Sequence, residues 1–180
     1  MMIRNVVLEL LRKDAYRTGE FKLSSGRTSK HYINCKPVTL SGKGLTIISD
    51  MILEHLEPNT VAVGGLTLGA DPLVCGVAMR GNIAGLIVRK EPKGHGTGAW
   101  IEGPVLPKGS EVVVLEDVIT TGGSAIKAAT RLRDAGYRVN KVVSIIDRQV
   151  DDEANEFMES VKLNLVSLYS LEEIAYAKDE

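Results

Sequence analysis

The sequence is poor in aromatic residues and has no excess of charge of either sign. Aromatic residues make up only 4% of its 180 residues, whereas apolar residues make up 44%. This composition suits one compact domain with an aliphatic core. The 22 basic and 23 acidic residues give a net charge of −1, so no global positive field marks a nucleic-acid-binding protein. Any site for an anion must therefore be local.

Cysteines and long apolar runs are also scarce. Cys35 and Cys75 stand in unrelated contexts and match neither a disulfide framework nor a paired metal-ligand spacing, which favours a reducing compartment. No uninterrupted apolar stretch approaches the roughly 20 residues that cross a bilayer. Near the N-terminus, Arg4 and Glu9 interrupt the apolar residues and no small-residue cleavage site follows. We therefore expect a soluble, cytoplasmic protein whose partners include neither membrane nor nucleic acid.

The first part of the chain shows three different patterns. Apolar residues at helical spacing predict a helix that ends near Asp14. From Phe21 to Leu40 the pattern favours short extended pieces broken at Gly26 and Pro37, as in a small β-substructure beside a core. Ser41 is a candidate N-cap for the helix that follows.

After Pro58, short apolar runs alternate with helical segments, which is typical of a mostly parallel sheet covered on both faces. Gly136 stands where a left-handed residue often ends a helix. The predicted strands are Val61–Gly64, Ala84–Val88, Glu111–Glu116 and Val139–Asp147, with helices at Gly69–Arg80 and Ser124–Ala135. A helix, a strand and a helix complete the predicted α/β domain at Glu153–Ser160, Asn164–Ser170 and Leu171–Ala177.

The most informative stretch, residues 112–124, joins an apolar strand to two carboxylates, a Thr/Gly/Ser loop and a helix. The carboxyl end of a parallel strand faces the ligand crevice, where Glu116 and Asp117 could accept hydrogen bonds from sugar hydroxyls. A phosphate monoester would find hydroxyls, unhindered N–H groups and a positive helix end. The residues that offer these groups are Thr120, Thr121, Gly122, Gly123 and Ser124. The stretch therefore predicts a site for a phosphorylated pentose.

The competing interpretation of this stretch is an ordinary strand–turn–helix with a polar turn. The combination is restrictive, however, and other nucleotide motifs fail on spacing: no P-loop occurs, and Gly94, Gly96 and Gly98 only imitate a dinucleotide fingerprint. Residues 112–124 resemble the phosphoribosyl pyrophosphate (PRPP) motif of type I phosphoribosyltransferases. This resemblance implies their fold, a mostly parallel sheet flanked by helices with a small N-terminal hood.

A second polar stretch, residues 89–103, follows a predicted strand and is too basic and glycine-rich for a core element. Such a mobile loop could bring cations to the charge that builds on a departing diphosphate; otherwise it is a solvated basic loop. It resembles the catalytic loop of orotate phosphoribosyltransferases. The resemblance implies a homodimer that shares this loop between subunits, catalytic roles for Lys93 and His95 beside Asp117, and diphosphate binding by Arg89, Lys90, Lys93 and His95.

Two further segments point to the base. Residues 23–34 resemble the hood signature of that family, and residues 146–149 resemble its orotate-binding arginine motif. Arg148 is the candidate partner of the orotate carboxylate, because a guanidinium can hold a carboxylate in two parallel hydrogen bonds. Alternatively, Arg148 pairs with Asp147 or Asp151. The motif position of Thr120 implies that it also faces the base.

The sequence departs from the family pattern in two places. Ser24 stands where many members have a lysine that touches substrate, and Lys36 is a possible replacement as an orotate ligand. The segment from Gly64 to Pro72 lacks the usual Tyr-Lys pair of the diphosphate turn. Thr67, Gly69 and backbone N–H groups would have to serve there, with Asp71 ordering the turn.

The resemblance as a whole implies one domain over residues 1–180, with a hood of about residues 1–40 plus part of the C-terminal segment and a core of about 41–150. It implies transfer of the 5-phosphoribosyl group from PRPP to orotate, which yields orotidine 5′-monophosphate and pyrophosphate in pyrimidine biosynthesis. Mg²⁺ would be held mainly by PRPP, with no direct protein ligand. The alternatives are a purine or uracil phosphoribosyltransferase and a regulator that senses PRPP and binds nucleic acid.

Overall fold

A computed structural model describes residues 2–22, 28–93, 99–149 and 152–176, and its centre is a six-stranded sheet. The strand order is β5–β4–β3–β6–β7–β8, and all neighbours run parallel except β5, which is antiparallel to β4. The strands are β3 (Thr60–Leu66), β4 (Ala84–Val88), β5 (Ile101–Glu102), β6 (Glu111–Ile119), β7 (Lys141–Asp147) and β8 (Asn164–Ser170). This is the mostly parallel sheet that the sequence predicts.

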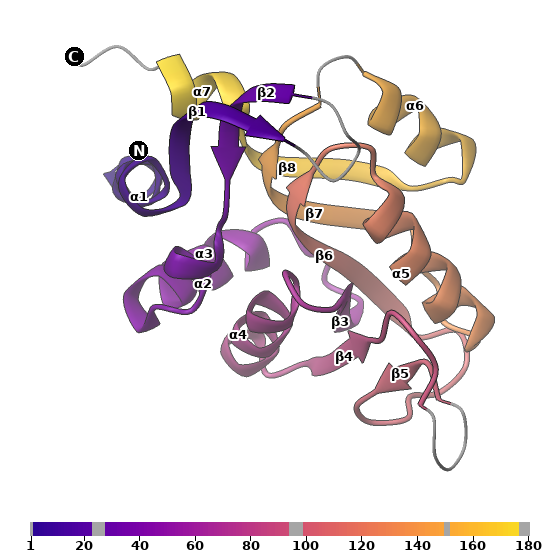
Figure 1. Cartoon of the computed structure of the whole chain (residues 1–180). Coiled ribbons are helices and arrows are strands. Elements are labelled where there is room, and N and C mark those ends of the chain that lie inside the picture. Colours follow the sequence, from indigo (N-terminus) through magenta and orange to yellow (C-terminus); the bar gives the residue numbers. More distant parts are fainter. Residues whose placement is uncertain (1, 23–27, 94–98, 150–151, 177–180) are drawn as a thin grey trace.

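Helices cover both faces of the sheet, as Figure 1 shows. On one face lie α1 (Met2–Leu10), which continues into a π-helical turn (Leu11–Ala15), α3 (Gly42–Leu53) and α4 (Asp71–Gly81); on the other lie α5 (Gly123–Asp134) and α6 (Glu153–Ser160). The helices on each face pack against the sheet around a separate apolar core. Because side chains alternate along a strand, Val113 and Leu115 of β6 join the α3–α4 side, whereas Val112 and Val114 join the α5 side.

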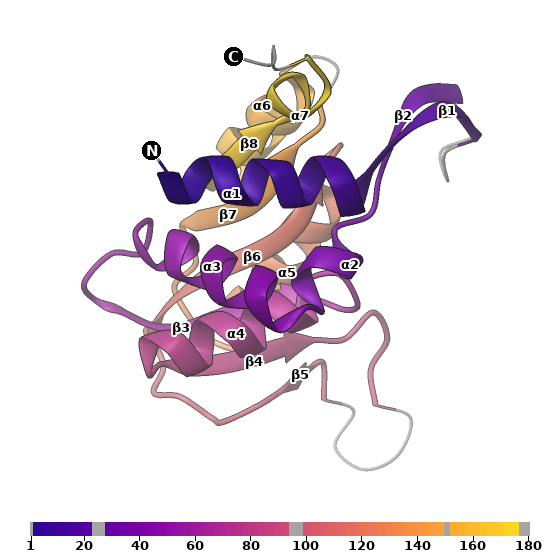
Figure 2. The ribbon, with the colours of Figure 1, turned by 90° about the vertical axis from the view of Figure 1, so that its left-hand side faces the viewer.

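The hood stands apart from the sheet (Figure 2). Its hairpin pairs β1 (Tyr16–Lys22) antiparallel with β2 (Thr28–Ile33), and α7 (Leu171–Tyr176) lies beside it. The Tyr16 hydroxyl lies 2.7 Å from Nδ1 of His31, and the Tyr176 hydroxyl lies 3.5 Å from its Nε2. Arg12 donates to the carbonyl oxygen of Ile174 at 3.2 Å. These contacts join segments from both ends of the chain into one substructure.

Several predicted boundaries are confirmed. β4, α6 and β8 have the predicted bounds, and Gly136 has a φ of +94°, the left-handed conformation expected after α5. Within the described residues, none of the helices is both long and apolar enough to span a bilayer.

Two predictions about local structure were wrong. Residues Lys36–Thr39 form a short helix, α2, where we expected extended chain. Pro37 lies in its first turn, where a missing N–H leaves no hydrogen bond unmade. β6 continues to Ile119 instead of ending at Glu116, because its backbone keeps pairing with β7 beneath the two carboxylates.

Candidate active site

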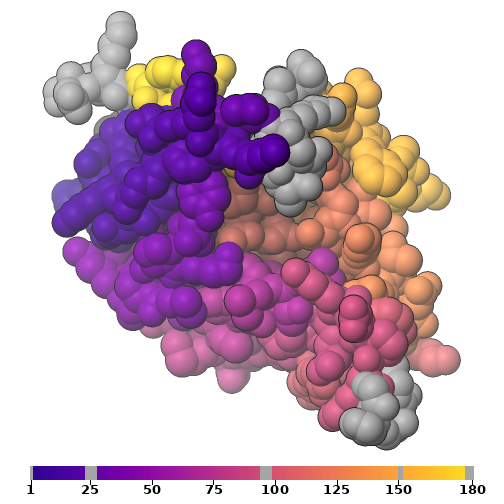
Figure 3. Space-filling view, in the orientation of Figure 1, coloured from indigo at the N-terminus to yellow at the C-terminus, as the bar shows by residue number. Residues whose placement is uncertain are grey.

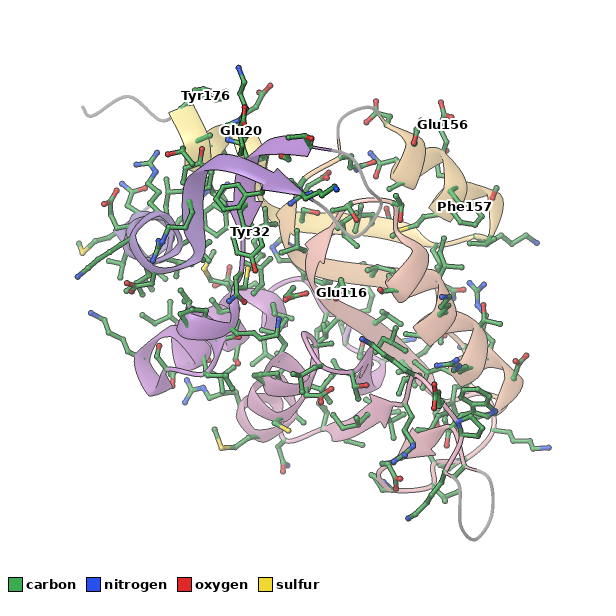
Figure 4. The ribbon with its side chains drawn as sticks, viewed as in Figure 1. Glu20, Tyr32, Glu116, Glu156, Phe157 and Tyr176 are labelled. Atoms are coloured by element: carbon green, nitrogen blue, oxygen red, sulfur yellow. The ribbon has the colours of Figure 1, made fainter. Side chains whose placement is uncertain are left out.

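The site forms where β6 loses one of its two neighbours. Pairing with β3 reaches Val114, whereas pairing with β7 continues to Ile119. Glu116 and Asp117 lie in this one-sided part of β6, at the carboxyl end of the sheet where ligands bind in parallel α/β folds. Figure 3 shows a hollow between the indigo hood and the core, and Figure 4 places Glu116 below the hood strand that carries Tyr32.

The Glu116 carboxyl is held in an unusual electrostatic state. It is only 6% exposed, and its Oε1 accepts a hydrogen bond from the N–H of Asp117 at 3.3 Å. Burial, followed by the neighbouring Asp117 carboxylate, raises the pKa of Glu116 well above its usual range. Oε2 is buried without a hydrogen-bond partner among the described residues. Leaving a buried oxygen without a hydrogen bond costs free energy. A ligand hydroxyl that bonded to Oε2 would remove this cost, so Oε2 is a candidate contact for a ligand.

Asp117 contacts the turn that precedes α4. Its Oδ1 accepts a hydrogen bond from the N–H of Val118 at 3.0 Å. A Cβ atom on Gly69 would lie 2.5 Å from that same oxygen, so only glycine fits without a shift of turn or carboxylate. The predicted diphosphate turn therefore lies directly against the predicted ribose carboxylate.

Backbone contacts order the turn itself. The N–H of Thr67 donates to the carbonyl oxygen of Val88 at 2.9 Å, and the N–H of Asp71 donates to that of Leu68 at 3.3 Å. Oδ1 of Asp71 is buried without a partner in the described part of the chain. The main chain, rather than the Asp71 carboxylate, thus closes the turn.

The loop after β6 leaves the start of α5 open. Thr120, Thr121 and Ser124 are exposed. Gly122 takes the N-cap position with a φ of +73°, and no side chain caps the helix. A Cβ on Gly122 would approach Cε of Met158 in α6 to 2.8 Å, so backbone conformation and close packing both require glycine. The N–H groups of the first turn can therefore bind a phosphate.

The basic loop begins at the carboxyl end of β4, on the same edge of the sheet. Arg89 Nη1 lies 3.2 Å and Lys93 Nζ 3.8 Å from Oε1 of Glu102. Lys90 is exposed. His95 lies outside the described residues, as does the hood position Ser24. The structure thus brings Arg89 and Lys93 together on one carboxylate that we did not single out from the sequence.

Arg148 follows β7 and stands beside the end of β6, since its N–H donates to the carbonyl oxygen of Ile119 at 2.9 Å. The side chain is half-buried, and this burial lowers its pKa. No described residue forms an ion pair with it; the Asp147 carboxylate accepts hydrogen bonds from Gln149 N and Nε2 at 2.9 and 2.7 Å. Asp151, the other alternative partner, lies outside the described residues.

Lys36 opens α2, beside the two carboxylates. Its positive charge lowers the pKa of Glu116 and so opposes the larger effect of burial. Its neighbour Cys35 is fully buried, with Sγ 3.9 Å from the carbonyl oxygen of Asp117. Burial raises the pKa of the Cys35 thiol, so this cysteine packs behind the site as an unreactive group.

The sequence and the fold were then compared with known proteins. No family model matches the chain. It is 60% identical over 152 residues to an orotate phosphoribosyltransferase of Thermosynechococcus vestitus, covering 82% of this chain and 80% of that protein. It is 50% identical over 174 residues to the orotate phosphoribosyltransferase of a Nostoc species, and the match covers 94% of this chain and 84% of that protein. The crystal structure of Mycobacterium tuberculosis H37Rv orotate phosphoribosyltransferase in complex with PRPP matches with a TM-score of 0.78 and 30% identity, covering 96% and 98%.

A parallel sheet with a carboxylate pair and an open phosphate loop at its carboxyl edge is the arrangement of a type I phosphoribosyltransferase. The two relatives are both orotate phosphoribosyltransferases, which narrows the class to that family. The chain belongs to the orotate phosphoribosyltransferase family. The predictions of fold and family made from residues 89–103, 112–124 and 146–149 are thereby confirmed.

Proposed function

We propose that the chain transfers the 5-phosphoribosyl group from PRPP to orotate and releases orotidine 5′-monophosphate and pyrophosphate, a step of pyrimidine biosynthesis. One observation carries the proposal: the buried carboxyl of Glu116 and the carboxylate of Asp117 stand between the open start of α5 and the turn that contacts Asp117. PRPP carries a phosphate at one end of the ribose and a diphosphate at the other, and the ribose hydroxyls lie between these two anionic groups. The site offers carboxyl groups between two anion-binding elements.

In this arrangement the ribose hydroxyls bind Glu116 and Asp117. The 5′-phosphate binds the N-terminus of α5 and the loop before it, through Thr120, Thr121, Gly122, Gly123 and Ser124. The diphosphate binds the turn at Thr67–Gly69 and the cations of the basic loop, Arg89, Lys90, Lys93 and His95. Each assignment uses the charge or hydrogen-bonding group that the ligand requires.

The reaction is a displacement at the anomeric carbon. The C–O bond to the diphosphate breaks and its electron pair leaves with pyrophosphate, while the ring nitrogen of orotate forms the C–N bond and releases its proton. The Asp117 carboxylate beside the sugar stabilises the positive charge that develops on the ring. Lys93 and His95 stabilise the negative charge on the leaving group. Positioning and charge stabilisation therefore carry the catalysis more than acid–base chemistry does.

Orotate would lie between the end of β6 and the hood. Arg148 holds its carboxylate in two parallel hydrogen bonds, which a neutral purine or uracil would not require. Thr120 contacts the base from the phosphate loop. Lys36, whose charge already reaches Glu116, supplies a second cation in place of the usual hood lysine, for which this chain has Ser24.

The residues present fit a magnesium ion that PRPP carries into the site. The described residues contain no cluster of three His, Cys, Asp or Glu side chains that could hold a metal by themselves. Oε2 of Glu116, buried without a partner in the described part of the chain, and the adjacent Asp117 would hold the ribose hydroxyls that lie next to such an ion. When bound, Mg²⁺ would neutralise negative charge on the diphosphate, and this ion is often held chiefly by substrate oxygens. The chain would orient the hydroxyls that share the ion.

The proposal extends to assembly and location. The chain forms a homodimer in which the basic loop serves the neighbouring subunit, and it works in the cytoplasm. The hood, about residues 1–40 plus part of the C-terminal segment, and the core, about residues 41–150, act as parts of one domain. Light scattering of the purified protein tests the dimer, since a mass of one chain would refute loop sharing.

The test of function is a base competition. Purified protein is incubated with PRPP and Mg²⁺, and the loss of orotate absorbance is followed, with uracil, adenine, hypoxanthine and guanine assayed in parallel. Turnover of orotate alone supports both the reaction and the role of Arg148. Turnover of another base would keep the phosphoribosyl site and remove the assignment of Arg148. Binding of PRPP without any turnover would favour a sensor over an enzyme.

A further inference from the structure

Arg131, in the last turn of α5, reaches across to the base of the basic loop. Its Nη1 donates to the carbonyl oxygen of Arg89, and its Nη2 donates to that of Lys90 at 3.0 Å. The guanidinium carbon lies 3.9 Å from the centroid of the Trp100 ring. One half-buried side chain therefore contacts both the segment that leaves β4 and the segment that leads into β5.

The two segments are also joined to each other. The N–H of Arg89 donates to the carbonyl oxygen of Trp100 at 2.9 Å, and the N–H of Lys93 donates to that of Ala99 at 3.1 Å. Just below, Val88 pairs with Ile101. Arg131 adds a third element to this base, because it donates to the carbonyl groups of Arg89 and Lys90.

We propose that Arg131 is a positioning residue for phosphoribosyl transfer: its clamp on the carbonyl groups of Arg89 and Lys90, supported by the Trp100 ring, sets where the cations of the basic loop stand. The inference rests on the proposed role of those cations in binding the diphosphate. Arg131 itself does not touch the substrate.

The geometry requires an arginine. A planar guanidinium can donate to two neighbouring carbonyl groups while its face rests on an aromatic ring. A lysine keeps the charge but offers a point donor that cannot span both carbonyl groups in one plane. Lysine is therefore expected to replace Arg131 poorly, which separates a geometric role from a purely electrostatic one.

The helix that carries Arg131 also begins at the phosphate loop. Gly123 starts α5, and Arg131 lies roughly 12 Å farther along a helix that rises about 1.5 Å per residue. A rigid helix thus joins the group that binds the 5′-phosphate to the base that holds the diphosphate cations. A shift of about 1 Å in a catalytic group can lower a rate by about 100-fold, so a fixed position for the base of the loop is valuable to the reaction, whichever subunit's site its cations enter.

A neighbouring arginine on the same helix provides a matched control. Arg133 donates to the carbonyl oxygens of Val139 at 3.0 Å, Val161 at 2.8 Å and Lys162 at 3.0 Å. These carbonyl groups lie at the opposite edge of the sheet from the site. Arg133 therefore makes hydrogen bonds like those of Arg131 but away from the site, so its loss should lower stability without affecting turnover. Thr130, which is exposed, provides a second control that should change neither property.

The experiment compares kcat, both KM values and Tm for Arg131→Ala, Arg131→Lys, Arg133→Ala and Thr130→Ala. For both Arg131 variants we expect kcat to fall about 10- to 100-fold and KM for PRPP to rise, with KM for orotate nearly unchanged and Tm lowered no more than in Arg133→Ala. Arg133→Ala should lower Tm and keep kcat. Wild-type kinetics in Arg131→Ala would overturn the inference, as would a loss of kcat in Arg131→Ala that Arg133→Ala reproduces at a similarly lowered Tm.

A binding measurement keeps this test separate from the fate of the proposed reaction. Trp100 is the chain's single tryptophan, so its fluorescence reports on the base of the loop. Titration with PRPP and Mg²⁺, without orotate, should give a Kd about tenfold weaker for Arg131→Ala than for wild type. Equal Kd values would sink the inference even if orotate is turned over. Weaker binding would support it even if the accepted base proves to be another one.

Discussion

Replacing Glu116 with glutamine should stabilise the protein against unfolding while weakening its binding of PRPP. The wild-type carboxyl is 6% exposed and has one oxygen without a partner in the described part of the chain. Its pKa is raised in the folded state from a usual value of 4.5. Glutamine has the same shape, its oxygen can still accept the N–H of Asp117, and its amide can donate to the Asp117 carboxylate.

The magnitude follows from proton linkage. Below pH 4.5 the carboxyl is protonated in both states, so it adds no penalty. As pH rises above that value, the unfolded chain ionises and the buried group does not, so the folded state loses up to about 1.4 kcal/mol per pH unit until its own pKa is reached. At pH 7.5 the ceiling is about 4 kcal/mol. The real penalty is smaller than this ceiling, because the protein around a buried group can rearrange and the denatured chain keeps some structure. We therefore expect Glu116→Gln to raise the free energy of unfolding by about 2 kcal/mol at pH 7.5, which corresponds to a rise of about 4 to 8 °C in Tm.

The assay is thermal unfolding of wild type and Glu116→Gln without ligand at pH 5.5, 6.5, 7.5 and 8.5. The gain in Tm should be small at the lowest pH and should grow with each step. Glu20→Gln, at an exposed position of the hood, should show no such trend. A variant that unfolds at or below the wild-type temperature at pH 7.5, or a gain independent of pH, would refute the reasoning.

Three further predictions concern binding and turnover. Gly69→Ala places a methyl group 2.5 Å from Oδ1 of Asp117, so KM for PRPP should rise about tenfold or more; an unchanged KM in initial-rate kinetics would disprove the tight contact. Lys93→Ala should lower kcat at least about tenfold with little change in Tm, because an exposed pair with Glu102 contributes about 1 kcal/mol or less; full turnover would remove Lys93 from catalysis. Arg148→Lys should raise KM for orotate about tenfold, because a lysine cannot form the paired hydrogen bonds, and an equal rise in KM for PRPP would assign Arg148 to another role.

Local patterns were enough to predict the elements whose ends are marked by their own residues. β4, α6 and β8 are of this kind: Gly81 and Asn82 precede the apolar run of β4, Asp152 precedes α6, and Ser170 ends β8. The bounds of β6 were not predictable in this way. Glu116 and Asp117 look like the end of a strand, yet backbone pairing with β7 continues beneath them. That pairing depends on the register of another strand, which side-chain polarity does not report.

The parts of the site also differ in whether local sequence is enough to predict them. The phosphate loop is one continuous segment, so its composition and the resemblance to a known motif were sufficient to find it. The contact between Gly69 and Asp117 and the clamp of Arg131 on the basic loop join segments from different strands and helices. Nothing near Arg131 in the sequence distinguishes it from Arg133. Only the packing of α5 shows which arginine faces the loop and which faces the lower edge of the sheet.

The one-sided pairing of β6 also bears on how this site can change during evolution. Beyond Val114 the strand has β7 on one side only, and the N–H groups of Asp117 and Val118 bond to the side-chain oxygens of Glu116 and Asp117. Any backbone groups offered to a ligand on this side therefore come from the turn before α4. Peptide groups are the same whatever side chain they carry. A site that binds the diphosphate through peptide groups of this turn, as proposed, would tolerate replacement of individual side chains, such as the missing Tyr-Lys pair, and keep its anion contacts. Alanine scanning would therefore understate what this edge contributes, and selection here would act on glycine positions and backbone shape.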